Sequence, residues 1–381
     1  MDSKYLILSG YFIYYIRHTT CRLCIIRYFI VMDKINPTAK LLKLIFDSTN
    51  YKHLIDSSMF ITGSTGFLGS ALLKSIDYIN REKKTNIKIF LLLRKNSNYA
   101  SIQDLNNTEV EVINGDLTNF KFVSLPIDHI IHLASEKAEN LIKYNKQKKN
   151  IIIYGTKRLI EYNKIINAKS FTFLSSGAIY GKNCKSKKGW KEENDYKNDL
   201  KNSNLNYAKF KREAEKILQD YYYLSGNLKT LNIFRAFSFG GYDNKENKFA
   251  YHNFIKKRIK RKNIYLQSNG NSIRNYMHPL DLANWIFKSL TLKGKNIINS
   301  GSNHNVSIKE LANIIAAHKF GDLPRVKIYL GNKKEQDIYI PNLNKANRIS
   351  LKCKVSLQKQ IEESFYIYYN KEYHEKKNCS F

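Results

Sequence analysis

The stretch MFITGSTGFLGSALLK, residues 59–74, sets Gly63, Gly66 and Gly69 three residues apart between an apolar run and a helical run. A tight turn from strand to helix needs backbone freedom at its first glycine, close approach to phosphate at its second and close helix packing at its third. The helix that follows presents free N–H groups and the positive end of its dipole to a pyrophosphate. This spacing therefore predicts a dinucleotide-binding turn.

Downstream of the turn, short apolar runs alternate with longer amphipathic segments, which is typical of a parallel sheet flanked by helices. The apolar runs are rich in β-branched residues, so we expect strands that are buried on both faces. We therefore predict an α/β fold, a Rossmann-type doubly wound parallel sheet with a smaller C-terminal α/β substrate lobe. Strands are expected at 59–63, 87–94, 110–115, 129–135, 170–176 and 228–236, and helices at 70–80, 151–166 and 207–226.

The predicted domain organisation has three parts. Residues 1–31 are an uncertain N-terminal extension, because Met32, followed by DKINPTAKLLKLIF, resembles a natural start of a protein. The extension is either an upstream addition to the reading frame or a weak membrane-surface anchor. Arginines interrupt this apolar segment, so no transmembrane span is predicted. Residues 32–240 form an NAD(P)-binding Rossmann domain with the catalytic residues. Residues 241–381 form a smaller substrate-binding lobe, interleaved with the first domain, because the order of elements loosens after about residue 240.

The formal net charge of +32 raises the question of a polyanionic partner. Lysine is scattered through nearly every segment, as a biased genome composition would produce, so we expect no specific nucleic acid partner. Only FIKKRIKRKN, residues 254–263, is locally dense in positive charge. On a helix it is either a solvated face or a region that attracts a phosphorylated substrate.

The five cysteines are odd in number and lack disulfide-like spacing, which indicates a reducing compartment and a cytoplasmic protein. Cys21 and Cys24 form a CxxC pair, but no second pair completes a zinc site. No metal centre is predicted.

The end of the second predicted strand bears on which dinucleotide binds. An acidic residue there would bind the ribose 2′-hydroxyl of NAD, whereas Arg94 suits the 2′-phosphate of NADP, so the expected cofactor is NADP or NAD, with NADP favoured by Arg94. Asp116 is expected to accept from the adenine amino group. The predicted cofactor-binding residues are Gly63, Thr65, Gly66, Phe67, Leu68, Gly69, Arg94, Asp116, Leu117, Leu133, Ala134, Ser135, Tyr207 and Lys211.

Tyr207 and Lys211 fall four residues apart and so share a helix face. A lysine ammonium near a phenol favours the phenolate and lowers the phenol pKa from its ordinary value of about 10. Ser176 ends a predicted strand, where its hydroxyl could bond the same substrate oxygen. These three residues predict an acid–base site that takes a proton from an alcohol while a nicotinamide accepts hydride, or runs the reverse.

With the glycine turn, the strand-end serine and the Tyr207–Lys211 pair in this order along the sequence, the chain resembles the extended short-chain dehydrogenase/reductase superfamily. Within it, the resemblance is to the NAD-dependent epimerase/dehydratase group that modifies nucleotide sugars. The resemblance runs from about residue 59 to about residue 348 and rests on the segments TGSTGFLG, NGDLTN, HLAS, YGTKRLIE, LSSGAIYG, YAKFK, IRNYMHPLDLA and INSGSNHNVSIKELA. It implies that Ser176, Tyr207 and Lys211 are the catalytic triad, that Ser176 and Arg274 bind substrate, and that the helices at 151–166 and 207–226 form a homodimer interface.

One departure narrows the activity. Family members that dehydrate or decarboxylate a sugar typically carry acidic residues just after the strand-end serine, whereas this chain has Gly177 and Ala178. The leading hypothesis is an NAD(P)-dependent nucleotide-sugar oxidoreductase, a 4-epimerase or 4-keto reductase, in surface polysaccharide biosynthesis. The alternatives are a 4,6-dehydratase or decarboxylase, a reductase of a non-sugar carbonyl and, least favoured, a non-catalytic scaffold.

Overall fold

The computed structural model describes residues 36–95, 97, 100–135, 151–181, 184, 186–194, 206–241, 249–319, 326–333 and 337–378. The predicted extension at 1–31 and its cysteine pair therefore lie outside the described residues.

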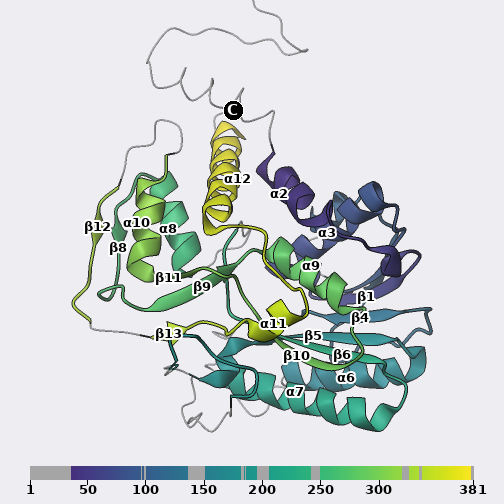
Figure 1. Ribbon diagram of the computed structural model, residues 1–381. Helices are drawn as coiled ribbons and strands as arrows, with labels where there is room; N and C mark the ends of the chain where they lie inside the picture. The colour runs from purple at the N-terminus through teal and green to yellow at the C-terminus, as the bar shows by residue number, and fades with distance from the viewer. Residues whose placement is uncertain are drawn as a thin grey trace, which may run out of the picture.

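The centre of the molecule is a seven-stranded parallel sheet (Figure 1). Its strands run in the spatial order β10-β6-β5-β4-β1-β2-β3, so the chain winds outward from β1 in one direction and then crosses over to wind in the other. The six strands expected from the sequence are confirmed. The bounds are β1 (Ser58–Thr62), β2 (Lys88–Leu93), β3 (Val110–Asn114), β4 (His129–His132), β5 (Ser170–Ser176), β6 (Thr230–Ala236) and β10 (Gly294–Ser300).

Helices cover both faces of this sheet (Figure 1). Side chains alternate along a strand, so Phe60 and Ile61 of β1 enter two different hydrophobic clusters, one on each face. The three expected helices are confirmed, and the one expected at 207–226 ends at Ser225, directly before Gly226, whose φ of +62° suits glycine. The covering helices are α6 (Ile151–Ile166) and α7 (Asn206–Ser225) on one face, and α2 (Pro37–Phe46), α3 (Phe67–Lys83) and α9 (Pro279–Ser289) on the other.

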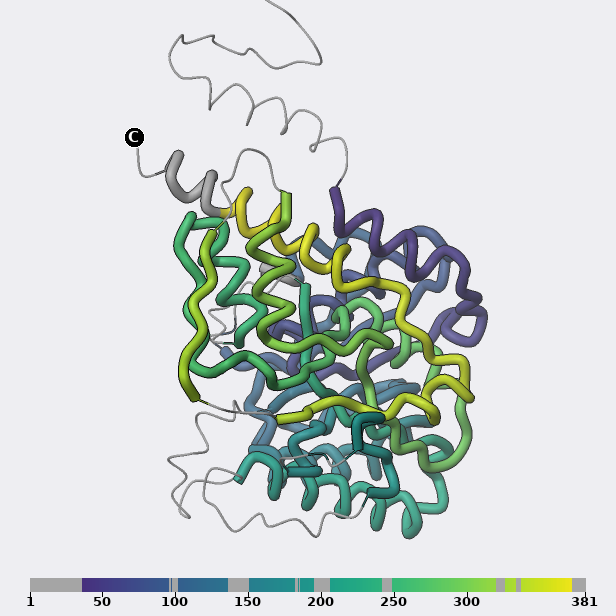
Figure 2. Tube along the Cα trace, turned by 60° about the vertical axis from the view of Figure 1, so that its left-hand side comes forward, coloured from purple at the N-terminus to yellow at the C-terminus, as the bar shows by residue number. Residues whose placement is uncertain are grey.

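A smaller lobe packs beside the sheet around its own hydrophobic cluster, with α8, α10 and α12 as its helices (Figures 1 and 2). Its largest strand, β9, pairs with β7, β11 and β13. The bounds are α8 (Ala250–Ile259), α10 (Ile308–Ala317), α12 (Leu357–Asn378), β7 (Ser238–Phe239), β8 (Ile264–Tyr265), β9 (Ile273–Met277), β11 (Asn305–Ser307), β12 (Ile328–Tyr329) and β13 (Ile338–Tyr339). The remaining short elements are η1 (Lys52–Leu54), α4 (Ala100–Gln103), η2 (Gly177–Tyr180) and α11 (Asn344–Arg348).

Residues 294–300 are the one large departure from the expected order of strands. The sequence pattern places them among the short elements of the smaller lobe, but they form β10 and pair in parallel with β6. The segment GKNIINS is too polar to be recognised as a strand of a central sheet, because β10 lies at the edge and its first four residues are only half-buried. Residues 294–300 thus add a strand to the central sheet from within the range 241–381.

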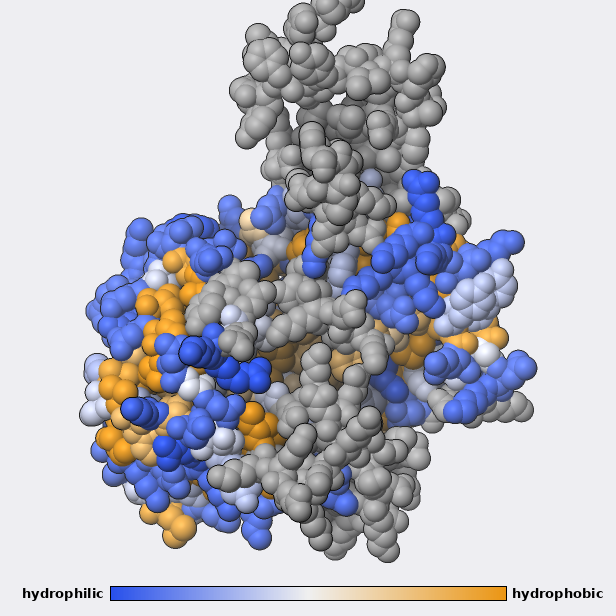
Figure 3. Space-filling view, turned by 180° about the vertical axis from the view of Figure 1, so that it is seen from behind, coloured by the Kyte–Doolittle hydropathy of each residue, from blue (hydrophilic) through white to orange (hydrophobic). Residues whose placement is uncertain are grey.

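Seen from behind, the described surface carries hydrophilic residues with patches of hydrophobic residues between them, some of which reach its edge (Figure 3). The positively charged stretch 254–263 begins inside α8, as expected. Within the described ranges, none of the helices has the length and apolar character needed to cross a membrane.

Candidate active site

The glycine turn follows β1 directly. Gly63 adopts a φ of +76°, and a Cβ there would lie 2.5 Å from the backbone nitrogen of Ala134. A Cβ on Gly69 would lie 2.2 Å from the carbonyl oxygen of Gly63, so the first turn of α3 can pack against the loop only without a side chain. The turn thus has the close approaches that the sequence predicts.

The start of α3 fits a pyrophosphate. Gly66 is its N-cap residue and has no side chain that could bond the first N–H groups of the helix. These groups and the positive end of the helix dipole are what an anionic ligand needs. Thr65, Phe67 and Leu68 are half-buried in the same turn, and Phe67 packs edge-on against His252 with ring centroids 5.7 Å apart.

The residues predicted to bind the rest of the dinucleotide lie at the ends of neighbouring strands. Arg94 follows β2 and is exposed. Asp116 follows β3, and its Oδ1 already accepts from the backbone N–H and the hydroxyl of Thr118, at 3.0 and 2.7 Å. Leu117 is buried against α6, where a Cβ on Gly155 would meet it at 2.4 Å.

The end of β4 joins the glycine turn to the predicted catalytic residues. The Leu133 N–H donates to the Thr62 carbonyl at 3.1 Å, and the Ala134 N–H donates to the Thr62 hydroxyl at 3.3 Å. Ser135 comes next, and its hydroxyl hydrogen bonds the phenol of Tyr207. Ser135, predicted to bind the cofactor, therefore lies next to Tyr207.

Ser176, Tyr207 and Lys211 come together at the carboxyl end of the sheet. The Ser176 hydroxyl also hydrogen bonds the Tyr207 phenol. The Lys211 ammonium is buried, donates to the Leu174 carbonyl at 2.7 Å and lies 5.8 Å from the centre of the Tyr207 ring. The spacing of Tyr207 and Lys211 on one helix face therefore produces the proximity that an acid–base pair requires.

The direction of one pKa differs from the expectation. Burial raises the pKa of Tyr207, and the hydrogen bonds from Ser135 and Ser176 oppose that rise. Burial also lowers the pKa of Lys211 to about 7, against the charge of Glu215, which raises it. Because desolvation is the largest cause, the net shift of the Tyr207 pKa is opposite in direction to the lowering expected from Lys211.

Arg274, expected to bind substrate, lies on β9 in the smaller lobe. Its guanidinium donates to a carboxylate oxygen and to the carbonyl of Asp337, both at 2.9 Å. It also lies 5.8 Å from the centre of the Tyr339 ring. In this arrangement Arg274 neighbours the site through Tyr339 and is held by an aspartate.

Tyr339 and Phe237 are site residues that the sequence does not reveal. The Tyr339 phenol hydrogen bonds Ser176, and its ring centroid lies 4.7 Å from that of Phe237. The Phe237 ring covers Gly177, where a Cβ would lie 2.8 Å from three ring carbons. Tyr339 belongs to a two-residue strand of the smaller lobe, so no local pattern marks it.

Among the residues that the structure describes, no group of three or more His, Cys, Asp or Glu side chains could hold a metal ion.

Comparison with known families gives one match over most of the chain. The family model described as "NAD dependent epimerase/dehydratase family" matches residues 59–301. This span begins at the second residue of β1 and ends just after β10, so it contains all of the seven-stranded sheet except Ser58.

Solved structures share the fold. A UDP-N-acetylglucosamine 4-epimerase from Methanobrevibacter ruminantium, in complex with UDP-N-acetylmuramic acid, has a TM-score of 0.67 at 21% identity and covers 82% of this chain and 99% of its own. A UDP-glucuronic acid 4-epimerase variant from Bacillus cereus, bound to a fluorinated substrate analogue and NAD, has a TM-score of 0.65 at 20% identity, with 82% and 99% covered. A UDP-glucose 4-epimerase from Thermotoga maritima, with UDP-glucose, has a TM-score of 0.65 at 16% identity, with 83% and 99% covered.

Proposed function

Because the chain belongs to the NAD-dependent epimerase/dehydratase family, we propose that it is a nucleotide-sugar 4-epimerase that acts on a UDP-sugar. The observation that carries this proposal is the meeting of Ser176, Tyr207 and Lys211 beside the glycine turn. The three solved structures described above, which are UDP-sugar 4-epimerases, support the choice of substrate.

Each side chain has a distinct role in this proposal. The Tyr207 phenol takes the proton of the sugar 4-hydroxyl and later returns it. The Ser176 hydroxyl donates a hydrogen bond to the same sugar oxygen and stabilises the charge that develops there. The Lys211 ammonium stabilises the phenolate form of Tyr207. A nicotinamide dinucleotide, held by the Gly63 turn and the start of α3, would supply the hydride transfer at C4.

The packing around Gly177 argues against dehydration or decarboxylation. Elimination needs an additional acid and base close to the reacting carbon. The Phe237 ring fills the space in which a side chain at position 177 would begin. A carboxylate cannot be accommodated there without moving this ring, which supports the assignment to epimerisation.

A 4-keto reductase is the second candidate, and Arg94 is the observation that favours it. An exposed arginine after β2 suits the 2′-phosphate of NADP, and a consumed reductant is usually NADPH. The two activities differ in one measurable respect. An epimerase regenerates its cofactor in each turnover, whereas a reductase oxidises one NADPH for each sugar.

The test is to incubate the purified protein with UDP-, dTDP-, CDP- and GDP-sugars and each cofactor, separating sugar epimers while nicotinamide absorbance is followed. Interconversion of a UDP-sugar and its C4 epimer, without net absorbance change, is the expected result. Stoichiometric loss of NADPH absorbance with a 4-keto sugar would instead establish the reductase. Failure to bind any nicotinamide cofactor would refute both activities.

Arg94 is proposed to give the site its preference for NADP. Arg94→Ala should weaken NADP binding by about tenfold, because one charge-assisted contact to the 2′-phosphate is lost, and should leave NAD binding unchanged. Titration calorimetry with the two cofactors measures both constants. The neighbouring exposed Lys95→Ala is the control. Equal losses for the two cofactors in Arg94→Ala would contradict the assignment.

We also propose a location, a pathway role and an oligomeric state for this enzyme. The enzyme acts in the cytoplasm and supplies an activated sugar for surface polysaccharide synthesis. It is a homodimer whose subunits meet through α6 and α7, which expose Tyr154, Ile165 and Leu224 by 47%, 50% and 85%. Apolar side chains exposed to this degree on neighbouring helices suit a partner surface.

A further inference from the structure

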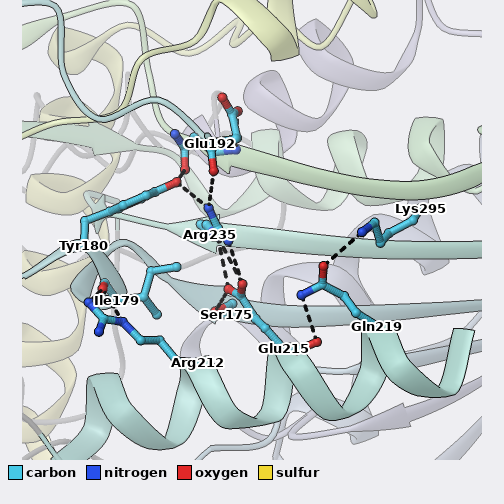
Figure 4. A network of polar contacts seen from close by, with 10 residues as sticks. Ser175, Ile179, Tyr180, Glu192, Arg212, Glu215, Gln219, Arg235 and Lys295 are labelled. Carbon is cyan, nitrogen blue, oxygen red and sulfur yellow. Dashed lines mark hydrogen bonds and ion pairs between the residues drawn. The ribbon is translucent and has the colours of Figure 1, made fainter. Parts of the chain in front are cut away.

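A buried ion pair lies next to the site and is not used by the reaction as described so far. Arg235 of β6 binds Glu215 of α7, with its Nη2 2.8 Å from Oε2 and its Nε 3.2 Å from both carboxylate oxygens (Figure 4). Each side chain is only 1% exposed. The pair is therefore almost fully removed from water.

Glu215 connects the two elements that carry the proposed catalytic residues. It follows Lys211 by four residues on α7, so the two side chains share one face of the helix. Its Oε1 also accepts a hydrogen bond from the hydroxyl of Ser175, which directly precedes Ser176 in β5. One carboxylate thus holds the end of the serine strand against the helix of Tyr207 and Lys211.

Arg235 is held in turn on its other side. Its Nη1 donates to the Tyr180 hydroxyl at 2.8 Å and to the Glu192 carbonyl at 2.9 Å. The Tyr180 hydroxyl donates onward to Asn299 of β10 at 2.7 Å. Figure 4 shows Arg235 between this group and Glu215, so the orientation of the carboxylate is fixed from β6, η2 and β10 together.

Such a pair is not an efficient way to stabilise a fold. Removing two charges from water costs several kcal/mol per ion in general, and well-packed apolar residues often replace a buried pair without loss of stability. A buried carboxylate does, however, act strongly on a nearby charge, because the surroundings screen it little. The nearby charge here is Lys211, which is 1% exposed.

We propose that Glu215 is a positioning residue of this site, whose carboxylate keeps the Lys211 ammonium charged and fixes the strand end that carries Ser176, while Arg235 holds that carboxylate in place. The expected effect of Glu215 on turnover rests on the proposed function. The expected effect of Glu215 on the charge of Lys211 does not depend on any substrate.

The described surroundings of Lys211 make Glu215 the group that opposes desolvation. From α7, Tyr207 and Glu215 face Lys211. From β4, His132 lies near, and burial together with the Lys211 charge lowers the His132 pKa to about 3, so this ring is neutral. From β5, Lys211 meets the Leu174 carbonyl and the Phe173 ring. Burial lowers the pKa of Lys211 to about 7, and Glu215 raises it. Loss of the Glu215 charge therefore lowers this pKa further.

The first test uses the protein without cofactor or substrate. With a Lys211 pKa of about 7 when folded and its ordinary 10.5 when unfolded, the unfolded chain binds more protons between these values, so stability rises with pH across that window. In Glu215→Gln this rise in Tm should begin at a pH about one unit lower. The measurement is Tm against pH for the wild type, Lys211→Met, Glu215→Gln and the double variant. In the Lys211→Met background, Glu215→Gln should no longer move the pH dependence.

The second test measures turnover. The alkaline limb of kcat against pH should move to lower pH in Glu215→Gln, with kcat at pH 8 reduced by about tenfold, because a Lys211 pKa lower by about one unit leaves about a tenth of the ammonium at that pH. Glu215→Asp keeps the charge and should recover part of both losses, and it serves in place of Glu215→Gln if that variant does not fold. Glu363→Gln, which removes another buried carboxylate, paired with His278, is the control and should keep the wild-type pH profile.

The two tests separate the possible failures. An unchanged pH dependence of Tm in both Glu215 variants would overturn the positioning role, whatever the enzyme does. Absence of epimerase and reductase activity in the wild type would overturn the proposed function, and the Tm measurement would still decide the role of Glu215. A Glu215→Gln enzyme with reduced kcat at every pH but an unmoved alkaline limb would show a merely structural pair and overturn the proposal.

Discussion

Tyr207→Phe is expected to lower kcat by about 10³-fold or more while the protein still folds and binds its cofactor, because positioned acid–base groups contribute about 10²–10⁴-fold and the Tyr207 ring lies 5.8 Å from the Lys211 ammonium. The substitution removes only the hydroxyl that Ser135 and Ser176 bond. The ring and its packing remain. The measurement is epimer interconversion under saturating UDP-sugar, with cofactor affinity measured in parallel.

Tyr223→Phe is the matched control for this prediction. Tyr223 lies on the same helix, is 67% exposed and lacks contact with Ser176 or Ser135 among the described interactions. It should keep wild-type turnover. If Tyr207→Phe retained more than about a tenth of the activity, the phenol could not be the acid–base group, since that residual is far above what general acid–base catalysis allows.

Gly69→Ala is expected to weaken dinucleotide binding by about 100-fold or more in affinity. The added methyl group meets backbone atoms that cannot move without changing the shape of the phosphate-binding turn. The new Cβ would lie 2.2 Å from the Gly63 carbonyl oxygen and 2.6 Å from the Ser64 Cα. Either the first turn of α3 moves away or the Gly63 loop changes shape. Cofactor titration followed by fluorescence or calorimetry measures the loss.

A matched control exists at the end of α7. Gly226→Asn changes another glycine at a helix terminus, but a Cβ there meets no atom within 4 Å, and asparagine tolerates the φ of +62°. It should bind cofactor as the wild type does. A Gly69→Ala protein that keeps its cofactor affinity would show that the turn does not hold the pyrophosphate.

Much of the fold is predictable because its signals are local. The strand-turn-helix around Gly63 combines an apolar run, glycine spacing and a following amphipathic run within 25 residues or so, and each of these reports on the next. The helix at 151–166 has the expected bounds because its apolar positions repeat at helical spacing. β10 is missed because an edge strand with half-buried lysine and asparagine lacks that signal.

Only those parts of the site that lie on a single helix or strand can be predicted from the sequence. Tyr207 and Lys211 are four residues apart on a helix, so their proximity is a local property. The sign of the Tyr207 pKa shift is not, because it depends on how much water the finished site excludes. Tyr339 and the Glu215–Arg235 pair depend on strands that are distant in the sequence, and single residues in those strands look ordinary before the sheet assembles.

The return of the chain to the central sheet after residue 249 has a consequence for how this protein can evolve and be engineered. The polypeptide leaves the sheet after β6, builds α8 and β9, re-enters through α9 and β10, and leaves again for α10 and α12. The smaller lobe is therefore no detachable module. Exchanging this lobe with the corresponding lobe of another enzyme would require at least one junction before β10 and one after it. A chimera with a single junction would lose β10, the outer strand of the sheet.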